Sequence, residues 1–130
     1  MRDYQLYLKD ILAAIDSIEE FVAGMDWEAF RVDDKTTSAV MRKLEIIGEA
    51  TKQIPDEIRQ NHPHVPWKEM AGMRDKLIHF YFGVDYQLVW RAIKERLPQI
   101  KPELQKILQE RASFRSAGRS PAPPPLQNRT

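Results

Sequence analysis

Apolar side chains recur at three- and four-residue intervals through most of this chain, and this period constrains the fold more than any other feature. Between residues 4 and 22 the apolar positions include Leu8, Ile11, Ile15 and Ile18, which share one face of a helix. No stretch alternates apolar and polar residues as a half-buried strand does. The pattern predicts an all-α protein, an up-and-down helical bundle with short connections.

Cap and stop residues divide the pattern into separate helices. Acidic residues that can cap helix N-termini recur along the chain: Asp26, Asp33 or Asp34, and Asp85. Other residues can end a helix: Gly24, Pro55 and Gly83. Pro55 could instead open the next short helical segment. Pro66 is expected in the first turn of the third long helix. Pro98 and Pro102 are expected to interrupt the helical pattern before a last helix that ends near residue 111.

The length of 130 residues predicts a single domain with a real core, which we place at residues 1–112. Residues 113–130 are rich in Ser, Pro and Arg and poor in apolar residues, so we expect a disordered C-terminal tail. The chain has no cysteine, which excludes disulfides and thiolate metal sites.

Charge is unevenly distributed, although 20 basic and 19 acidic residues give a net charge of only +1. Residues 111–130 hold four arginines and no acid, so residues 1–110 carry 16 basic and 19 acidic side chains. That balance is not typical of a general nucleic-acid binder, and contact with a phosphate backbone would need a local basic patch. With neither a signal peptide nor a membrane span in the pattern, we expect a cytosolic protein.

The third long helix is apolar on both sides. One stripe suits the inside of a bundle: Met70, Met73, Leu77 and Phe80. The opposite side, where a polar surface is normal, carries small and apolar residues together with Asp75 and His79: Ala71, Gly72, Ile78 and Phe82. A helix of this kind needs burial on both sides, so we predict a symmetric homodimer across it, with Asp75 and His79 at the seam.

Spacing within this helix relates its polar residues to one another. Asp75 and His79 are four apart, so their side chains can meet, and the carboxylate would fix the imidazole tautomer. Arg74 and His79 are five apart and do not share a face. They converge only if the arginine sweeps round the helix or the partner's residues take part. Tyr81 lies nearly in line with Arg74.

Residues 74–81, RDKLIHFY, fit the R-x4-H-x-Y pattern of HEPN-domain proteins. Flanking segments agree as well: LEIIGEA, IPDEIR, the dipeptide of Pro66 and Trp67, and FGVDYQLVW. From about residue 4 to residue 110 the chain resembles the HepT ribonuclease toxins of HepT/MntA toxin–antitoxin systems. The basic tail lies outside this pattern.

The resemblance implies a dimeric, metal-independent endoribonuclease without a cofactor, in which Arg74 and His79 are the catalytic pair. It also implies a cognate MntA-like nucleotidyltransferase antitoxin that adenylylates the toxin, with Tyr81 as the acceptor. Asp75 stays open between orienting His79 and capping the dimer seam, and we favour orientation. The alternative function is a non-catalytic HEPN module that binds a nucleotide or scaffolds the transferase. A third interpretation is a plain helical dimerisation domain.

Other residues have simpler interpretations. His62 and His64 could suggest a metal site, but we expect exposed loop histidines without an acidic partner, and no metal. Trp67 and Trp90 could stack bases, but their spacing within apolar stripes favours the core. Lys68, in the first turn of the third long helix, is a candidate guide for the RNA backbone. Without the flanking matches, Arg74 and His79 would be read as a salt bridge and a buried histidine.

Overall fold

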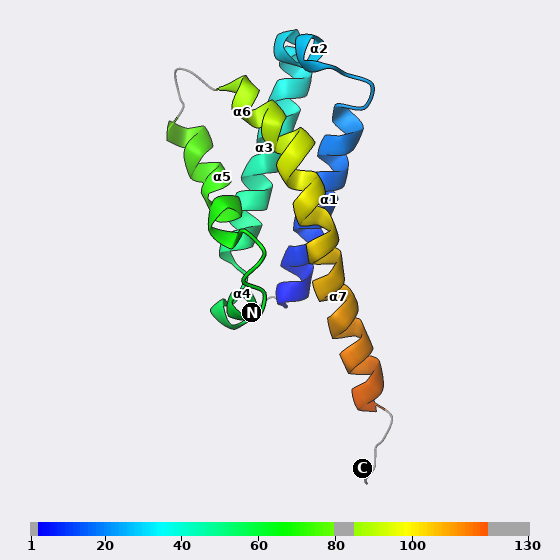
Figure 1. The fold of residues 1–130 in the computed structure, drawn as a ribbon. Helices are drawn as coiled ribbons and strands as arrows, with labels where there is room; N and C mark the ends of the chain where they lie inside the picture. The colour runs from blue at the N-terminus through cyan, green and yellow to red at the C-terminus, as the bar shows by residue number, and fades with distance from the viewer. Residues whose placement is uncertain (1–2, 80–84, 120–130) are drawn as a thin grey trace.

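Four long helices form an up-and-down bundle in this computed structural model (Figure 1). The structure describes the backbone of residues 3–79 and 85–119, and side chains for residues 3–73 and 85–110. The long helices are α1 (Tyr4–Phe21), α3 (Asp34–Lys52), α5 (Trp67–His79) and α7 (Leu97–Arg119). Shorter helical segments join them: α2 (Trp27–Val32), α4 (Asp56–Asn61), α6 (Tyr86–Arg91) and the π-helical turn η1 (Ala92–Arg96). The predicted all-α bundle is confirmed, whereas the homodimer stays a prediction.

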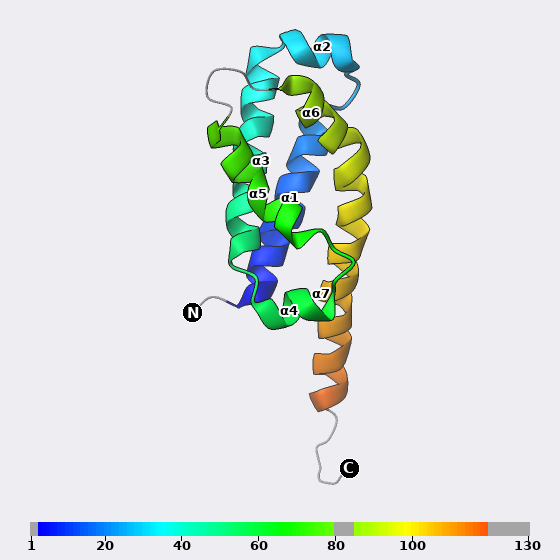
Figure 2. The same cartoon turned by 60° about the vertical axis from the view of Figure 1, so that its left-hand side comes forward.

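Helix α3 is central to the arrangement. It packs against both α1 and α5, and α7 closes the bundle against α1. Figures 1 and 2 show α2 and α6 together at one end of the bundle and α4 at the other. The ends are therefore formed by α2, α4 and α6, and the long helices enclose one core between them.

The core is made of the periodic apolar positions. Its fully buried side chains come from several helices: Leu8, Ile11, Ile15, Ile18, Phe30, Val40, Ile47, Met70 and Leu104. The Phe30 ring of α2 packs at a tilt against the Trp90 ring of α6, with ring centroids 4.9 Å apart, which ties the two short helices together at their end of the bundle. Thr51 is also fully buried, and its hydroxyl donates to the Ile47 carbonyl, so this polar group is satisfied within its own helix.

Helix starts follow the predicted caps. The carboxylate of Asp26 accepts a hydrogen bond from the Ala29 N–H at 2.9 Å, and Asp33 and Asp85 cap α3 and α6 in the same way. Gly24, with φ +79°, follows the end of α1 in a backbone conformation that glycine adopts most readily. The cap residues and the stop at Gly24 are therefore confirmed.

The predicted interruptions at Pro98 and Pro102 are wrong, because helical backbone continues from α6 through η1 to the end of α7. A proline cannot donate to the carbonyl four residues earlier, and its ring crowds that turn. The wide turn η1 lies directly before Pro98, and in it Leu97 donates to Ala92, five residues back. Such π turns are one of the ways in which helices adjust to local distortion.

Helix α7 reaches Arg119, beyond the predicted domain boundary at residue 112. Residues 113–119, expected to be disordered, therefore have a helical backbone. Residues 120–130 lie outside the described part, so the boundary itself stays a prediction. Within the described ranges, none of the helices combines the length and apolarity needed to cross a bilayer.

Candidate active site on helix α5

The second half of α5 carries the residues that the R-x4-H pattern singles out. Arg74, Asp75 and His79 all belong to its helical backbone, which ends at His79. Their side chains are outside the described part of the structure, and Tyr81 lies outside it entirely. The roles of these four residues therefore stay predictions, and the described residues around them define what the site is built on.

The first half of α5 is anchored in the core by the predicted inward stripe. Met70 is fully buried, and Met73 is partly buried against the core cluster. Trp67 is 6% exposed, and its indole Nε1 donates to the His62 carbonyl at 2.9 Å. The interpretation of Trp67 as a core residue is confirmed, and Trp90 also packs partly buried against the core.

The outer side of the same helix segment is open at Gly72. A Cβ built on this glycine would meet no heavy atom within 4 Å. Ala71 beside it is only half-buried. The protomer therefore offers a place where the backbone of another molecule could approach α5 closely.

An ion pair connects α5 to η1, the π-helical turn between α6 and α7. Arg96 of η1 donates from Nε to Glu69 Oε2 at 2.9 Å and from Nη2 to Glu69 Oε1 at 3.0 Å. Its third nitrogen, Nη1, donates to Gln99 Oε1 at 2.9 Å. The hydrogen bonds to the Glu69 carboxylate, and secondly its charge, raise the pKa of Arg96 above its ordinary value.

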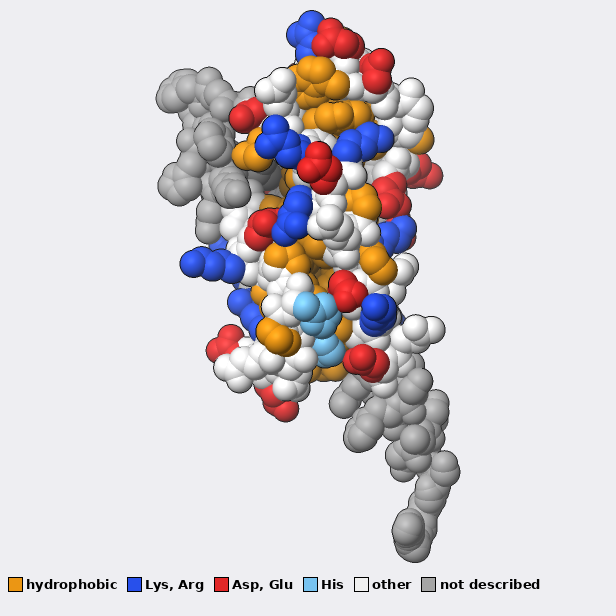
Figure 3. Space-filling view, in the orientation of Figure 1, with side chains coloured by type: hydrophobic (Ala, Val, Ile, Leu, Met, Phe, Trp, Pro, Cys, Tyr) orange, Lys and Arg blue, Asp and Glu red, His pale blue; other side chains and the backbone are white. Residues whose placement is uncertain are grey.

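A second contact joins the loop before α5 to α7. His64 Nε2 lies 3.0 Å from Glu103 Oε1, and Lys106 Nζ lies 3.3 Å from the other oxygen. Figure 3 shows the histidines on the surface beside acidic and basic side chains. The expected exposure of His64 is confirmed, at 54%, but the expected lack of an acidic partner is wrong. The fold brings Glu103 from a distant helix to the loop, which local sequence does not reveal.

Two further surface features bear on a nucleic-acid site. Lys68 is exposed in the first turn of α5, on the helix that carries the predicted catalytic pair. Lys94 of η1 lies over the Trp90 ring at 5.0 Å, so this ring face is covered by the lysine. Lys68 therefore remains a candidate contact for an RNA backbone, and Trp90 is a poor stacking platform.

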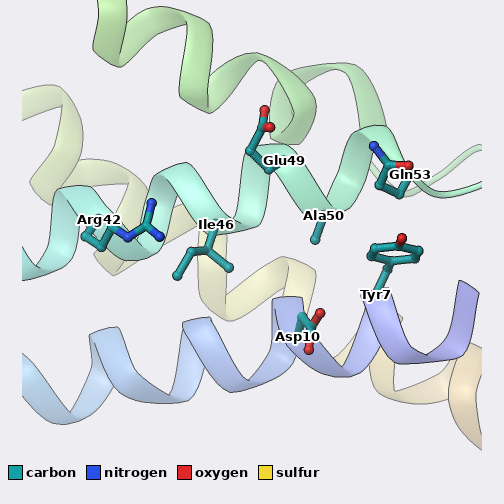
Figure 4. A pocket seen from close by; sticks show the side chains of 7 residues that line it. All are labelled: Tyr7, Asp10, Arg42, Ile46, Glu49, Ala50 and Gln53. Carbon is teal, nitrogen blue, oxygen red and sulfur yellow. The ribbon is translucent and has the colours of Figure 1, made fainter. Parts of the chain in front are cut away.

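An open groove of about 510 Å³ lies elsewhere, between α1 and α3 (Figure 4). It is lined by side chains of both helices: Tyr7, Asp10, Arg42, Ile46, Glu49, Ala50 and Gln53. Arg42 is ion-paired with Glu45 of its own helix. Among the described residues, no three His, Asp or Glu side chains gather as a metal site would require.

Comparison with known families matches residues 11–107 to the family described as "Ribonuclease HepT-like". A protein of Methanocaldococcus jannaschii named "Putative RNase" is 51% identical over 109 residues, which cover 84% of this chain and 94% of that protein. The "Probable ribonuclease HepT" of Thermococcus cleftensis is 51% identical over 106 residues, 82% of this chain and 96% of that protein. No solved structure matches the chain significantly.

A helical bundle with an R-x4-H pattern on its third long helix is characteristic of a HEPN-type domain. The match over residues 11–107 and the 51% identity to these relatives define the family more narrowly. The chain belongs to the HepT-like ribonuclease family.

Proposed function

We propose that this protein is a metal-independent endoribonuclease whose catalytic pair, Arg74 and His79, acts in a cleft between two copies of the chain. The observation that carries the proposal is family membership over most of the chain, combined with the occurrence of both residues on one helix, α5. The open space at Gly72 of the same helix supports a cleft formed with a second copy.

RNA supplies its own nucleophile, which explains why a metal is not needed. The ribose 2′-oxygen attacks the neighbouring phosphorus, a base takes the 2′-hydroxyl proton, and an acid protonates the leaving 5′-oxygen as the P–O5′ bond breaks. The unperturbed pKa of histidine, about 6.5, suits both proton transfers. Arginine remains charged and offers a planar fork of donors to the phosphate oxygens. One His79 cannot perform both transfers in a single step, so two protomers would supply base and acid.

The dimer can be tested at Gly72. Gly72→Gln is expected to leave the protomer folded, because a Cβ at this position meets no heavy atom within 4 Å. The longer side chain keeps the second helix away, so we expect a monomer that no longer cuts RNA, measured by sedimentation equilibrium and RNA cleavage. Ala13→Gln adds the same side chain at an exposed position of α1 and serves as the control. A fully active dimer of the Gly72 variant would contradict this arrangement.

Independence from metal ions gives a second expected result. RNA cleavage by protein treated with EDTA should proceed at the untreated rate, because base, acid and phosphate contact all come from side chains. A magnesium-dependent nuclease in the same buffer must lose its activity as the control. Loss of cleavage in EDTA that added Mg²⁺ or Mn²⁺ restores would contradict a mechanism based on side chains alone.

Regulation follows from the same site. We propose a toxin neutralised by a nucleotidyltransferase antitoxin that transfers AMP from ATP to Tyr81. The phenol oxygen attacks the α-phosphorus, a base accepts its proton, and pyrophosphate leaves. An anionic AMP group two residues beyond His79 would occupy the position of the RNA phosphate and offer Arg74 a competing phosphate. The enzyme would then be inactive while still folded.

A non-catalytic module that binds a nucleotide or scaffolds the transferase remains the alternative. Expression in a host separates the two functions. Growth arrest with RNA breakage that depends on both Arg74 and His79 supports the ribonuclease. Indifference of the host to alanine at either position favours the scaffold.

A further inference from the structure

We propose that Arg96 and Glu69 act as positioning residues, forming a clamp that fixes the rotation of α5 about its own axis and thereby aligns the catalytic residues. The inference rests on the proposed function, because it concerns the helix that carries Arg74 and His79. Neither clamp residue belongs to the R-x4-H pattern.

The contact has the geometry of a clamp. Two parallel hydrogen bonds join the guanidinium to both carboxylate oxygens at 2.9 and 3.0 Å, which restricts orientation as well as distance. The third donor group of Arg96 is held by Gln99 at 2.9 Å, so the guanidinium plane is itself fixed. A single point-charge contact would leave Glu69 free to swing, whereas this arrangement does not.

The position of the contact matters because α5 is supported unevenly. Its extensive packing is against α3. On the side of η1 and α7, the Arg96–Glu69 pair is the ion pair that reaches α5 itself among the described side chains. The His64–Glu103 pair holds the loop before this helix. A bidentate contact adds geometric specificity to apolar packing, so this pair restrains the rotation of α5 from a second side.

The π turn η1 supports this assignment. It contains Arg96 at its last position and lies directly before Leu97, which is 1% exposed. Three buried residues follow one another here at intervals of four: Val89, Ile93 and Leu97. The wider π turn keeps residues at this spacing on the same face of the helix. The turn therefore keeps the core register of α6 and α7 while directing Arg96 towards α5.

A small rotation would have a large effect on catalysis. Side-chain ends lie about 5–6 Å from a helix axis, so a rotation of about 10° moves them by about 1 Å. A misplacement of about 1 Å can reduce the rate of a positioned reaction about 10²-fold. Glu69 precedes Arg74 by five residues and His79 by ten, so one rigid helix would transmit the rotation to both.

The test uses three variants of the full chain: Arg96→Gln, Glu69→Gln and Arg96→Lys. We expect the turnover number for RNA cleavage to fall about 10- to 100-fold in both glutamine variants, with little change in KM. Arg96→Lys keeps the charge but not the fork, so its loss should be smaller. Thermal stability should change little, because an ion pair about 40% exposed contributes little to folding.

The glutamine variants also separate positioning from electrostatic attraction of RNA. If Arg96 only attracted RNA, Glu69→Gln would improve binding, since it removes a negative charge. If the pair acts as a clamp, Glu69→Gln should instead slow the turnover of RNA. Lys101→Gln is the matched control: it removes one positive charge from α7 and breaks the pairs with Asp16 and Glu19 of α1, without touching α5. Its turnover should equal that of the wild type.

Amide hydrogen exchange gives a readout that does not depend on RNA. Exchange of residues 70–79 should become several-fold faster in both glutamine variants and stay unchanged in Lys101→Gln. Wild-type turnover together with wild-type exchange in α5 would overturn the clamp. A wild-type protein that cuts no RNA would refute the proposed function instead, while exchange in α5 would still decide whether the clamp holds the helix.

Discussion

Protein carrying His79→Ala or Arg74→Ala is expected to cut RNA about 10² to 10⁴ times more slowly than the wild type. Without the imidazole, the site lacks a general base for the 2′-hydroxyl proton and a general acid for the leaving 5′-oxygen that work near neutral pH. Without the guanidinium, the charge that develops on the phosphorane is no longer neutralised by a fixed donor. The two losses should not add when combined, because both residues serve one transition state.

The measurement is single-turnover cleavage of a labelled RNA with the enzyme in excess, and the folding of each variant is checked separately. His62→Ala is the matched control, since it removes another histidine whose contact to Trp67 runs through its backbone carbonyl. Equal rates for the His79 and His62 variants would refute the assignment. Mixed dimers of wild-type and His79→Ala chains add a further distinction, because a shared cleft predicts near-complete loss and separate sites predict half activity.

Tyr81→Phe is expected to escape neutralisation completely. Phenylalanine keeps the ring but has no oxygen to accept AMP, so the antitoxin and ATP can no longer silence the enzyme. Co-expression with the nucleotidyltransferase should therefore still arrest growth. Intact mass after incubation with the partner and ATP should show added AMP on the wild-type chain and none on the variant.

Tyr86→Phe provides the control for this substitution. Tyr86 begins α6, five residues beyond Tyr81, and is partly buried against the core. Its variant should be modified and neutralised as the wild type is. Full neutralisation of Tyr81→Phe by the partner in the presence of ATP would refute adenylylation of Tyr81 as the control mechanism.

Local signals in the sequence were enough to predict the helical character of the chain and several helix starts. Asp26, Asp33 and Asp85 act within three residues of themselves, so their capping role is visible without tertiary structure. The inward position of Met70 follows equally from helical periodicity, because a side chain on the apolar stripe must face the core.

Contacts between distant segments could not be predicted in the same way. Glu69 and Arg96 are 27 residues apart, and both look like ordinary surface charges in the sequence. The continuity of the helix through Pro98 depends on the wide turn before it and on buried neighbours such as Leu97. The positions of Arg74 and His79 within α5 were predictable, whereas what holds that helix in place was not.

The order in which the helices contact one another also bears on how the chain folds. Helix α1 meets α3, and α3 meets α5, so much of the packing joins elements that follow closely in the sequence. Among the well-packed helix pairs of the described part of the chain, α1 with α7 closes the longest loop. Helical bundles dominated by such short-range contacts fold in microseconds to milliseconds, because little loop-closure entropy is lost before contacts form. A newly synthesised chain should thus spend little time with its apolar faces exposed.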